Sequence, residues 1–79
     1  MDTMNDTIYN MLAEVKPEFD FTDSENFIED GLLDSFDIIV LCGMLEEHFK
    51  IEIDGLDIVP ENFFSVDAIA ELAEKSPRK

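Results

Sequence analysis

The stretch from Gly31 to Asp37 leads into the longest apolar-periodic segment of the chain, residues 35–50. Asp34 can be the N-cap of a helix there, because its carboxylate can accept hydrogen bonds from backbone N–H groups of the first turn. Asp37 stands where a capping box places its acid. Ser35 then occupies the first helical position, where its hydroxyl is exposed and the helix dipole favours an attached anion. The local pattern fits a serine that carries a phosphate group, but Asp-Ser before an apolar run is common, and the local pattern by itself favours residues that only cap a helix.

Apolar residues at helical spacing also occur near both ends of the chain. Residues 4–16 follow a capping pattern at Thr3, and Pro17 marks a boundary, so the sequence predicts a first helix there. Ser65 precedes the last such segment and caps a predicted final helix. Pro60 suits the start of a short helical turn. The sequence therefore predicts an all-α fold with three main helices and one short helix.

In a long segment, residues 17–34, the apolar residues follow neither helical nor strand spacing for any length. Six large apolar residues are too many for a free linker, and they are Phe19, Phe21, Phe27, Ile28, Leu32 and Leu33. We therefore expect an ordered loop pinned to the core, with a turn at Gly31. Long loops of this kind are uncommon unless they are functional, and this one would set how Ser35 is presented.

The structure expected for the rest of the chain is simpler. Residues 51–58 are predicted to be an extended connector, because no second strand is available to pair with Ile51–Ile53. The length of 79 residues suits one small domain over residues 1–79. We expect its core to span about residues 4–75 and its basic tail, residues 76–79, to be frayed.

The predicted helix over residues 35–50 is apolar on two faces. With about 100° between successive residues, one face is assigned to the core and contains Ile38, Leu41, Cys42, Leu45 and Phe49. The other face contains Phe36, Val40 and Met44, with Gly43 and Glu47 among them. All-round burial is hard to arrange in so small a domain, so we expect this second face to dock a partner. Coverage by another helix or by a loop is the alternative.

The chain is strongly acidic, with a formal net charge of −15. All 20 acidic residues lie within residues 1–74, where only Lys16 and Lys50 are basic. Such a surface repels nucleic acid and anionic membranes. It attracts partners that carry basic patches, mainly by accelerating encounter. A role of the charge in solubility alone is the alternative.

Candidate chemistry outside Ser35 is sparse. No apolar stretch is long enough to span a membrane, and the acidic start differs from a secretory signal, so we expect no membrane insertion. The single cysteine, Cys42, fits a reducing, cytoplasmic location. His48 has no second histidine beside it, and residues 20–30 lack the glycine that a calcium loop needs at its sixth position. We therefore predict no metal site and no catalytic residue.

The residues around Ser35 also carry a family resemblance. Asp34-Ser35-Phe36, with Glu29–Leu33 before it and Leu45–Phe49 after it, resembles the phosphopantetheine attachment site of acyl carrier proteins. The similarity continues in the same order through three later segments, residues 51–53, 60–63 and 65–69. It therefore covers most of the chain.

The resemblance implies a small antiparallel helical bundle with a 4′-phosphopantetheine arm on Ser35. A phosphopantetheinyl transferase would add the arm from coenzyme A, and Asp34 matches the acid that the transferase recognises. The thiol of the arm would hold an acyl group as a thioester, and the chain would deliver it to enzymes without catalysing a reaction. We expect a stand-alone, monomeric acyl carrier protein whose ligases or synthases dock through basic patches. The predicted docking residues are Phe36, Asp37, Val40, Gly43, Met44 and Glu47.

Three positions depart from the fatty-acid carriers. Phe36 stands where the fatty-acid carriers usually have leucine. The segment Gly31–Phe36 instead resembles D-alanyl carrier proteins, which are loaded by an adenylating ligase. The later segment Pro60–Phe63 does not resemble the D-alanyl carriers. Val40 occupies a position that is often acidic, and Lys50 replaces a glycine that would readily take a left-handed cap conformation. An aminoacyl cargo such as D-alanine is thus the alternative cargo. An unmodified acidic interaction module is the alternative from another class.

Overall fold

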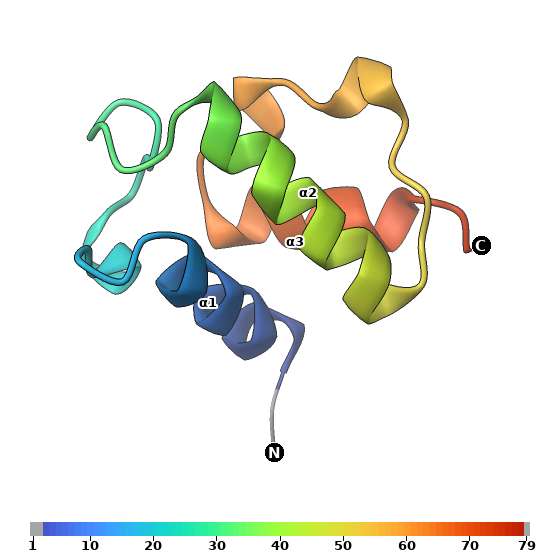
Figure 1. The fold of residues 1–79 in the computed structure, drawn as a ribbon, viewed down its shortest axis with the longest axis horizontal. Helices are drawn as coiled ribbons and strands as arrows, with labels where there is room; N and C mark the ends of the chain where they lie inside the picture. Colours follow the sequence, from blue (N-terminus) through green and yellow to red (C-terminus); the bar gives the residue numbers. More distant parts are fainter. Residues whose placement is uncertain (1–2, 79) are drawn as a thin grey trace.

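A computed structural model of the chain describes residues 3–78 and is helical throughout its regular elements. The three α-helices are α1 (Met4–Val15), α2 (Ser35–Phe49) and α3 (Val66–Lys75), and the three short 3-10 turns are η1 (Phe21–Asp23), η2 (Gly55–Asp57) and η3 (Pro60–Asn62). Figure 1 shows α1 running in the direction opposite to α2. The predicted all-α fold of three main helices is confirmed, and the short helix predicted at Pro60 is η3.

The ends of the helices follow local capping chemistry. Thr3 accepts a hydrogen bond from the backbone N–H of Asp6, whose carboxylate accepts one from the N–H of Thr3. The Ser65 hydroxyl accepts one from the N–H of Ala68 at the start of α3. At the other end of α1, Lys16 is the C-cap rather than the last helical residue, one position earlier than predicted. Side-chain acceptors thus satisfy N–H groups that a helix start leaves unpaired.

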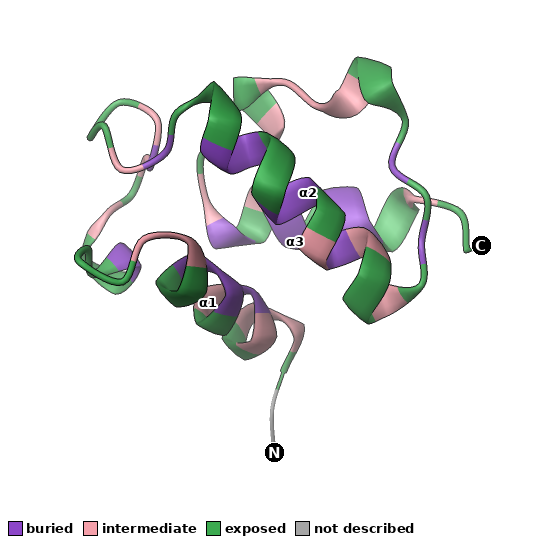
Figure 2. Cartoon of the chain, in the orientation of Figure 1, coloured by how far each residue is buried: buried purple, intermediate pink, exposed green. Residues whose placement is uncertain are grey.

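One apolar core joins the helices and the loops (Figure 2). α1 packs against both α2 and α3. The largest fully buried side chains come from all parts of the chain, and they are Phe27, Phe63, Ile8, Leu12, Leu41, Leu45, Ile69 and Leu72. On α2 the buried apolar residues are Ile38, Leu41, Cys42 and Leu45, as predicted, while Phe49 is only partly buried.

The loop between α1 and α2 is held to the core by two of its three aromatic residues, whereas Phe19 is 39% exposed, so the prediction that Phe19 helps to pin the loop is wrong. Phe21 and Phe27 are buried and meet edge to face with ring centroids 5.0 Å apart. The backbone N–H of Phe27 donates to the carbonyl of Phe64 at 2.7 Å, which ties the loop to the segment before α3. Gly31 turns the chain with φ +73°, a conformation that side chains rarely adopt. Leu33, buried at 4% exposure, then fixes the entry into α2.

The C-terminal tail differs from the sequence prediction. The backbone N–H of Glu52 donates to the carbonyl of Pro77 at 2.8 Å, and Ile51 forms an isolated antiparallel bridge with Arg78. The expectation of a frayed tail is therefore wrong for residues 76–78, and Lys79 lies outside the described residues. Ile51 is buried, so the backbone N–H and C=O groups beside it need hydrogen-bond partners. The C-terminal tail supplies the carbonyl of Pro77 as a partner, although the tail and Ile51 are far apart in the sequence.

The end of α2 is strained at a single residue. Lys50 has φ 57° and ψ 50°, the left-handed conformation, and is the one residue other than glycine with positive φ in the described part of the chain. Its N–H donates to the carbonyl of Glu46, which keeps the helix turn closed. The helix therefore ends as it would with a glycine at this position, and the strain falls on the lysine backbone.

We predict that Lys50→Gly is more stable than Lys50→Ala by about 1 kcal/mol, because only glycine adopts this φ without strain. Both variants remove the lysine charge beside the negative end of the helix dipole, so their difference isolates the backbone. Urea denaturation of the two proteins measures it. Equal free energies of unfolding would show that Lys50 is unstrained.

Candidate functional site

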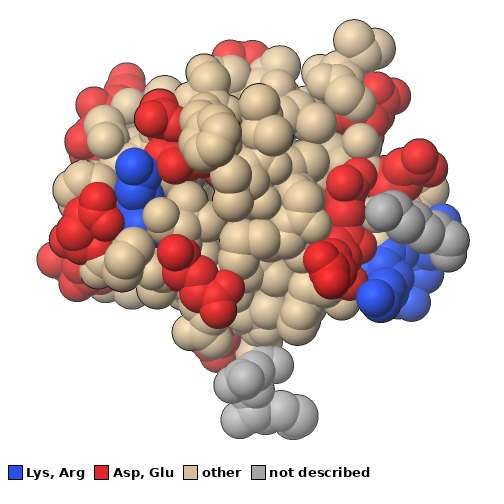
Figure 3. All heavy atoms as spheres, viewed as in Figure 1, with Lys and Arg blue, Asp and Glu red and all other residues tan. Residues whose placement is uncertain are grey.

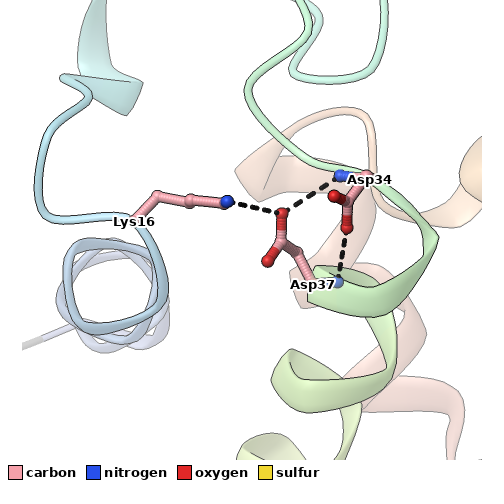
Figure 4. Close-up of polar contacts among 3 residues, drawn as sticks. All are labelled: Lys16, Asp34 and Asp37. Atoms are coloured by element: carbon pink, nitrogen blue, oxygen red, sulfur yellow. Dashed lines mark hydrogen bonds and ion pairs between the residues drawn. The ribbon is translucent and has the colours of Figure 1, made fainter.

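The start of α2 is a closed pair of reciprocal hydrogen bonds. The carboxylate of Asp34 accepts the backbone N–H of Asp37 at 2.9 Å, and the carboxylate of Asp37 accepts the backbone N–H of Asp34 at 3.2 Å (Figure 4). Ser35 lies between them in the sequence, at the first helical position. The predicted capping box is confirmed, and it fixes the backbone on both sides of Ser35.

The two acids of this capping box have different surroundings. Asp34 is exposed, and the hydrogen bond from the N–H of Asp37 lowers the pKa of its carboxyl; the charge of Lys16 acts in the same direction. Asp37 is only 6% exposed, and Lys16 Nζ lies 3.4 Å from its Oδ2. Asp34 thus presents a carboxylate to solvent, whereas Asp37 is buried in an ion pair. The prediction that Asp37 belongs to an outward docking face is wrong, because its side chain points inward to Lys16 (Figure 4).

The hydroxyl of Ser35 differs from those of the other three serines in the chain. Ser24 donates to the carboxylate of Asp30, Ser65 accepts from the N–H of Ala68, and Ser76 donates to the carbonyl of Leu72. Ser35 is exposed, and within residues 3–78 its hydroxyl has no hydrogen-bond partner. An exposed, unengaged hydroxyl at the positive end of a 15-residue helix suits the attachment of an anionic group.

The outward face of α2 is apolar at its first two turns. Phe36 is 71% exposed and Val40 is 38% exposed, as the two-faced pattern predicted. Ile39, at 63% exposure, also belongs to this face, although it is not among the predicted docking residues. It follows Phe36 by three residues, a spacing that places two side chains next to each other on a helix. The three-residue spacing of two large apolar residues was the signal that the sequence offered.

The later part of the predicted face is less uniform. Gly43 and Glu47 are exposed, but Met44 is partly buried and packs against the core. Met44 lines a shallow hollow between α1 and α2, together with Met11 of α1. Met44 therefore belongs to the edge of the face, and its centre consists of Phe36, Ile39 and Val40.

Gly43 has free space around it. A Cβ built on Gly43 would meet no atom within 4 Å, so close helix packing does not require glycine there. Glycine inside a helix costs about 1 kcal/mol relative to alanine. A tight contact within the fold is thus excluded as its reason, which leaves a tolerated defect or a dip on a docking face.

The surface charge is arranged around this face. Figure 3 shows a band without charged side chains over the part of the molecule where α2 lies, with acidic side chains on both sides of it. The exposed residues of α2 from Ser35 to Gly43 are all uncharged. The chain has 20 acidic residues, so most of its surface is negatively charged. The uncharged face of α2 differs from that surface.

The other candidate groups have the following surroundings. Within residues 3–78, no three His, Cys, Asp or Glu side chains are placed to hold a metal ion. Burial raises the pKa of the Cys42 thiol, and the nearby charge of Glu46 adds to the effect, so Cys42 stays a neutral apolar side chain. His48 makes an edge-to-face contact with Phe49 at 4.8 Å between ring centroids.

We predict that Ser35→Ala changes the free energy of unfolding by no more than about 0.5 kcal/mol, because the hydroxyl makes no hydrogen bond to residues 3–78. Ser65→Ala is the matched control, since it removes the same group from a helix start where that group is a cap. It should cost about 1 kcal/mol. Chemical denaturation measures both, and an equal loss in the two variants would show that the Ser35 hydroxyl stabilises the fold.

Comparison with known proteins finds a family model that matches most of the chain. The family model described as "Phosphopantetheine attachment site" matches residues 6–75, a range that includes nearly all of α1 and the whole of α2 and α3. Neither a curated protein nor a solved structure matches the chain significantly. None of the helices in residues 3–78 has the length and apolar character needed to cross a membrane.

The residues at the start of α2 fit the group that this family carries. They offer an exposed serine hydroxyl that has no hydrogen-bond partner among the described residues, at a helix N-terminus that favours the negative charge of a phosphodiester. The cofactor of the family is covalently bound 4′-phosphopantetheine, and its members are carriers that a phosphopantetheinyl transferase modifies. Because the family model covers most of its length, the chain belongs to the phosphopantetheine attachment site family.

Proposed function

We propose that Ser35 carries the 4′-phosphopantetheine arm and that the chain is an acyl carrier protein. The observation that supports this is the state of its hydroxyl, which is exposed at the start of α2 and free of hydrogen bonds within residues 3–78. The hydroxyls of the other three serines are engaged in the fold. Modification of Ser35 would therefore break no interaction that stabilises the protein.

The chemistry of attachment follows from these residues. The oxygen of Ser35 would form a phosphodiester to phosphorus, the pyrophosphate bond of coenzyme A would break, and the adenosine bisphosphate half would leave. The hydroxyl proton would go to a base of the transferase. The backbone N–H groups of the first turn of α2 favour the negative charge that stays beside Ser35. Asp34, exposed and with a lowered pKa, supplies a carboxylate for recognition by the transferase and its metal-bound coenzyme A.

Once attached, the arm supplies a thiol that holds cargo as a thioester. We propose an acyl group as the cargo, delivered to partner enzymes in the cytoplasm by a monomeric carrier. An aminoacyl group such as D-alanine is the second candidate, favoured by the similarity of Gly31–Phe36 to D-alanyl carriers. Incubation of the modified protein with an adenylating ligase and an amino acid, or with acyl donors, distinguishes the two. The family assignment argues against the alternative of an unmodified interaction module.

The modification itself is the first test. Incubation with coenzyme A and a broad-specificity transferase should add one phosphopantetheine to the wild-type protein, as seen in the intact mass. Ser35→Ala should add none, because it lacks the accepting oxygen. Ser24→Ala and Ser76→Ala are matched controls and should be modified like wild type. Addition to the Ser35→Ala protein would place the arm elsewhere and reject the assignment.

We further propose that partner enzymes dock on the outward face of α2, centred on Phe36, Ile39 and Val40. These side chains are exposed and adjacent to Ser35, so an enzyme that reaches the arm must pass beside them. An interface of this kind has an apolar centre and a charged rim. Asp34 and Glu47 stand at the two ends of the face and would attract basic groups of a partner. Gly43 would let a partner side chain approach the helix backbone closely.

Val40→Lys tests this face. Val40 is 38% exposed, so the free energy of unfolding should fall by only about 0.5 kcal/mol. Loading of the arm should nevertheless slow by at least about tenfold, because a lysine would stand where a partner's basic groups approach. Ala13→Lys is the matched control, since it adds the same charge at an exposed position of α1. A stable Val40→Lys protein that is loaded at the rate of Ala13→Lys would reject the face as a docking site.

A further inference from the structure

Lys16 connects the end of α1 to the start of α2. It is the C-cap of α1, and its backbone N–H donates to the carbonyl of Leu12 at 2.9 Å. Leu12 is fully buried, so the backbone of Lys16 is anchored on the core. The side chain extends from this fixed point toward α2, and its ammonium lies 3.4 Å from the carboxylate of Asp37 (Figure 4).

A single oxygen of Asp37 has two partners. Oδ2 accepts the backbone N–H of Asp34 at 3.2 Å and is also the atom nearest to Lys16 Nζ. The cation and the N-cap backbone therefore meet on one atom, and the position of that atom depends on both. Asp34 and Asp37 enclose Ser35 in the sequence, so this oxygen helps to fix the turn that presents the Ser35 hydroxyl.

No other basic residue in residues 3–74 can replace Lys16 in this role. Lys50, the other basic residue before residue 75, is the C-cap at the opposite end of the 15-residue α2. The side chain of Asp37 is 9% exposed and that of Lys16 is 29% exposed, so water only partly screens the pair. Removing one member of a largely buried ion pair leaves the other charge uncompensated.

We propose that Lys16 is a positioning residue for phosphopantetheine attachment. It acts through Asp37: without the lysine, the buried carboxylate turns toward water and releases the N–H of Asp34. The turn over residues 34–37 then loosens, and Ser35 no longer presents its hydroxyl in one orientation. Transfer between two bound groups is sensitive to displacements of about 1 Å, so the rate of attachment falls. The inference rests on the proposed attachment to Ser35.

The test compares three single variants in the transfer reaction with coenzyme A and a broad-specificity transferase. Lys16→Met should lower kcat/KM for the carrier by about tenfold, a moderate value for a misplaced reacting group. Lys16→Arg keeps the charge and should stay within about twofold of wild type. Lys50→Met removes the same charge at the far end of α2 and should also stay within about twofold. Each rate is measured below the midpoint of thermal unfolding of every variant.

Amide hydrogen exchange gives a readout that does not depend on the transferase. In Lys16→Met, the N–H of Asp34 should exchange about tenfold faster, because it loses its acceptor. The N–H of Ile69 donates to the carbonyl of Ser65 in the first turn of α3, so it is an internal reference and should be unchanged. A purely general loss of stability would accelerate both amides alike and would overturn the proposal.

A double variant tests whether Lys16 acts through Asp37. Asp37→Ala and Lys16→Met/Asp37→Ala should be equally slow, because both leave the N–H of Asp34 without its acceptor and no carboxylate remains for the lysine to hold in place. The double variant leaves no unpaired buried charge, so it carries the test if Lys16→Met alone does not fold. Wild-type rates in the double variant, or a further loss relative to Asp37→Ala, would overturn the proposal.

The two proposals fail in different ways. If the wild-type protein accepts no phosphopantetheine, or accepts it at another residue, the attachment to Ser35 is rejected whatever the amide exchange shows. If Ser35 is modified and Lys16→Met is modified at the wild-type rate, attachment stands and the positioning role of Lys16 is rejected. Equal losses in Lys16→Met and Lys50→Met also reject it, because they would indicate an effect of net charge alone.

Discussion

The reciprocal hydrogen bonds between Asp34 and Asp37 are the local constraint on which the site depends. They satisfy the backbone N–H of Asp37 in the first turn and the backbone N–H of Asp34 at the N-cap. Together they hold Ser35 at the first position of the helix. Neither hydrogen bond uses the Ser35 hydroxyl, so capping and modification fall to different residues. A serine that served as the cap itself, as Ser65 does at α3, would have its oxygen engaged by a backbone N–H.

Burial in the preceding loop determines where that capping box lies. Phe27 and Leu33 are almost fully buried, and Gly31 turns the chain between them with a positive φ. The loop is therefore fixed to the core by its side chains rather than by regular backbone pairing. Because Leu33 directly precedes Asp34, the start of α2 is placed by apolar packing on one side and by the ion pair to Lys16 on the other.

The sequence predicted those features that depend on neighbouring residues. Capping at Asp34 and Ser65, and the buried side of α2, follow from spacings of three and four residues. The ion pair between Lys16 and Asp37 and the pairing of Glu52 with Pro77 could not be predicted in this way. Each joins segments that are separated by a loop or a helix. The path of the chain between such segments cannot be read from the spacing of neighbouring residues.

The acidity of the chain and the apolar face of α2 are physically related. Three large apolar side chains exposed on one helix would favour association between copies, because their burial releases water. A net charge of −15 opposes that association, since two copies that approach face to face also bring together the acids beside the uncharged band (Figure 3). A partner with basic groups around an apolar patch meets attraction where a second copy meets repulsion. The same charge distribution can therefore keep the face free of self-association and still leave it open to a partner enzyme.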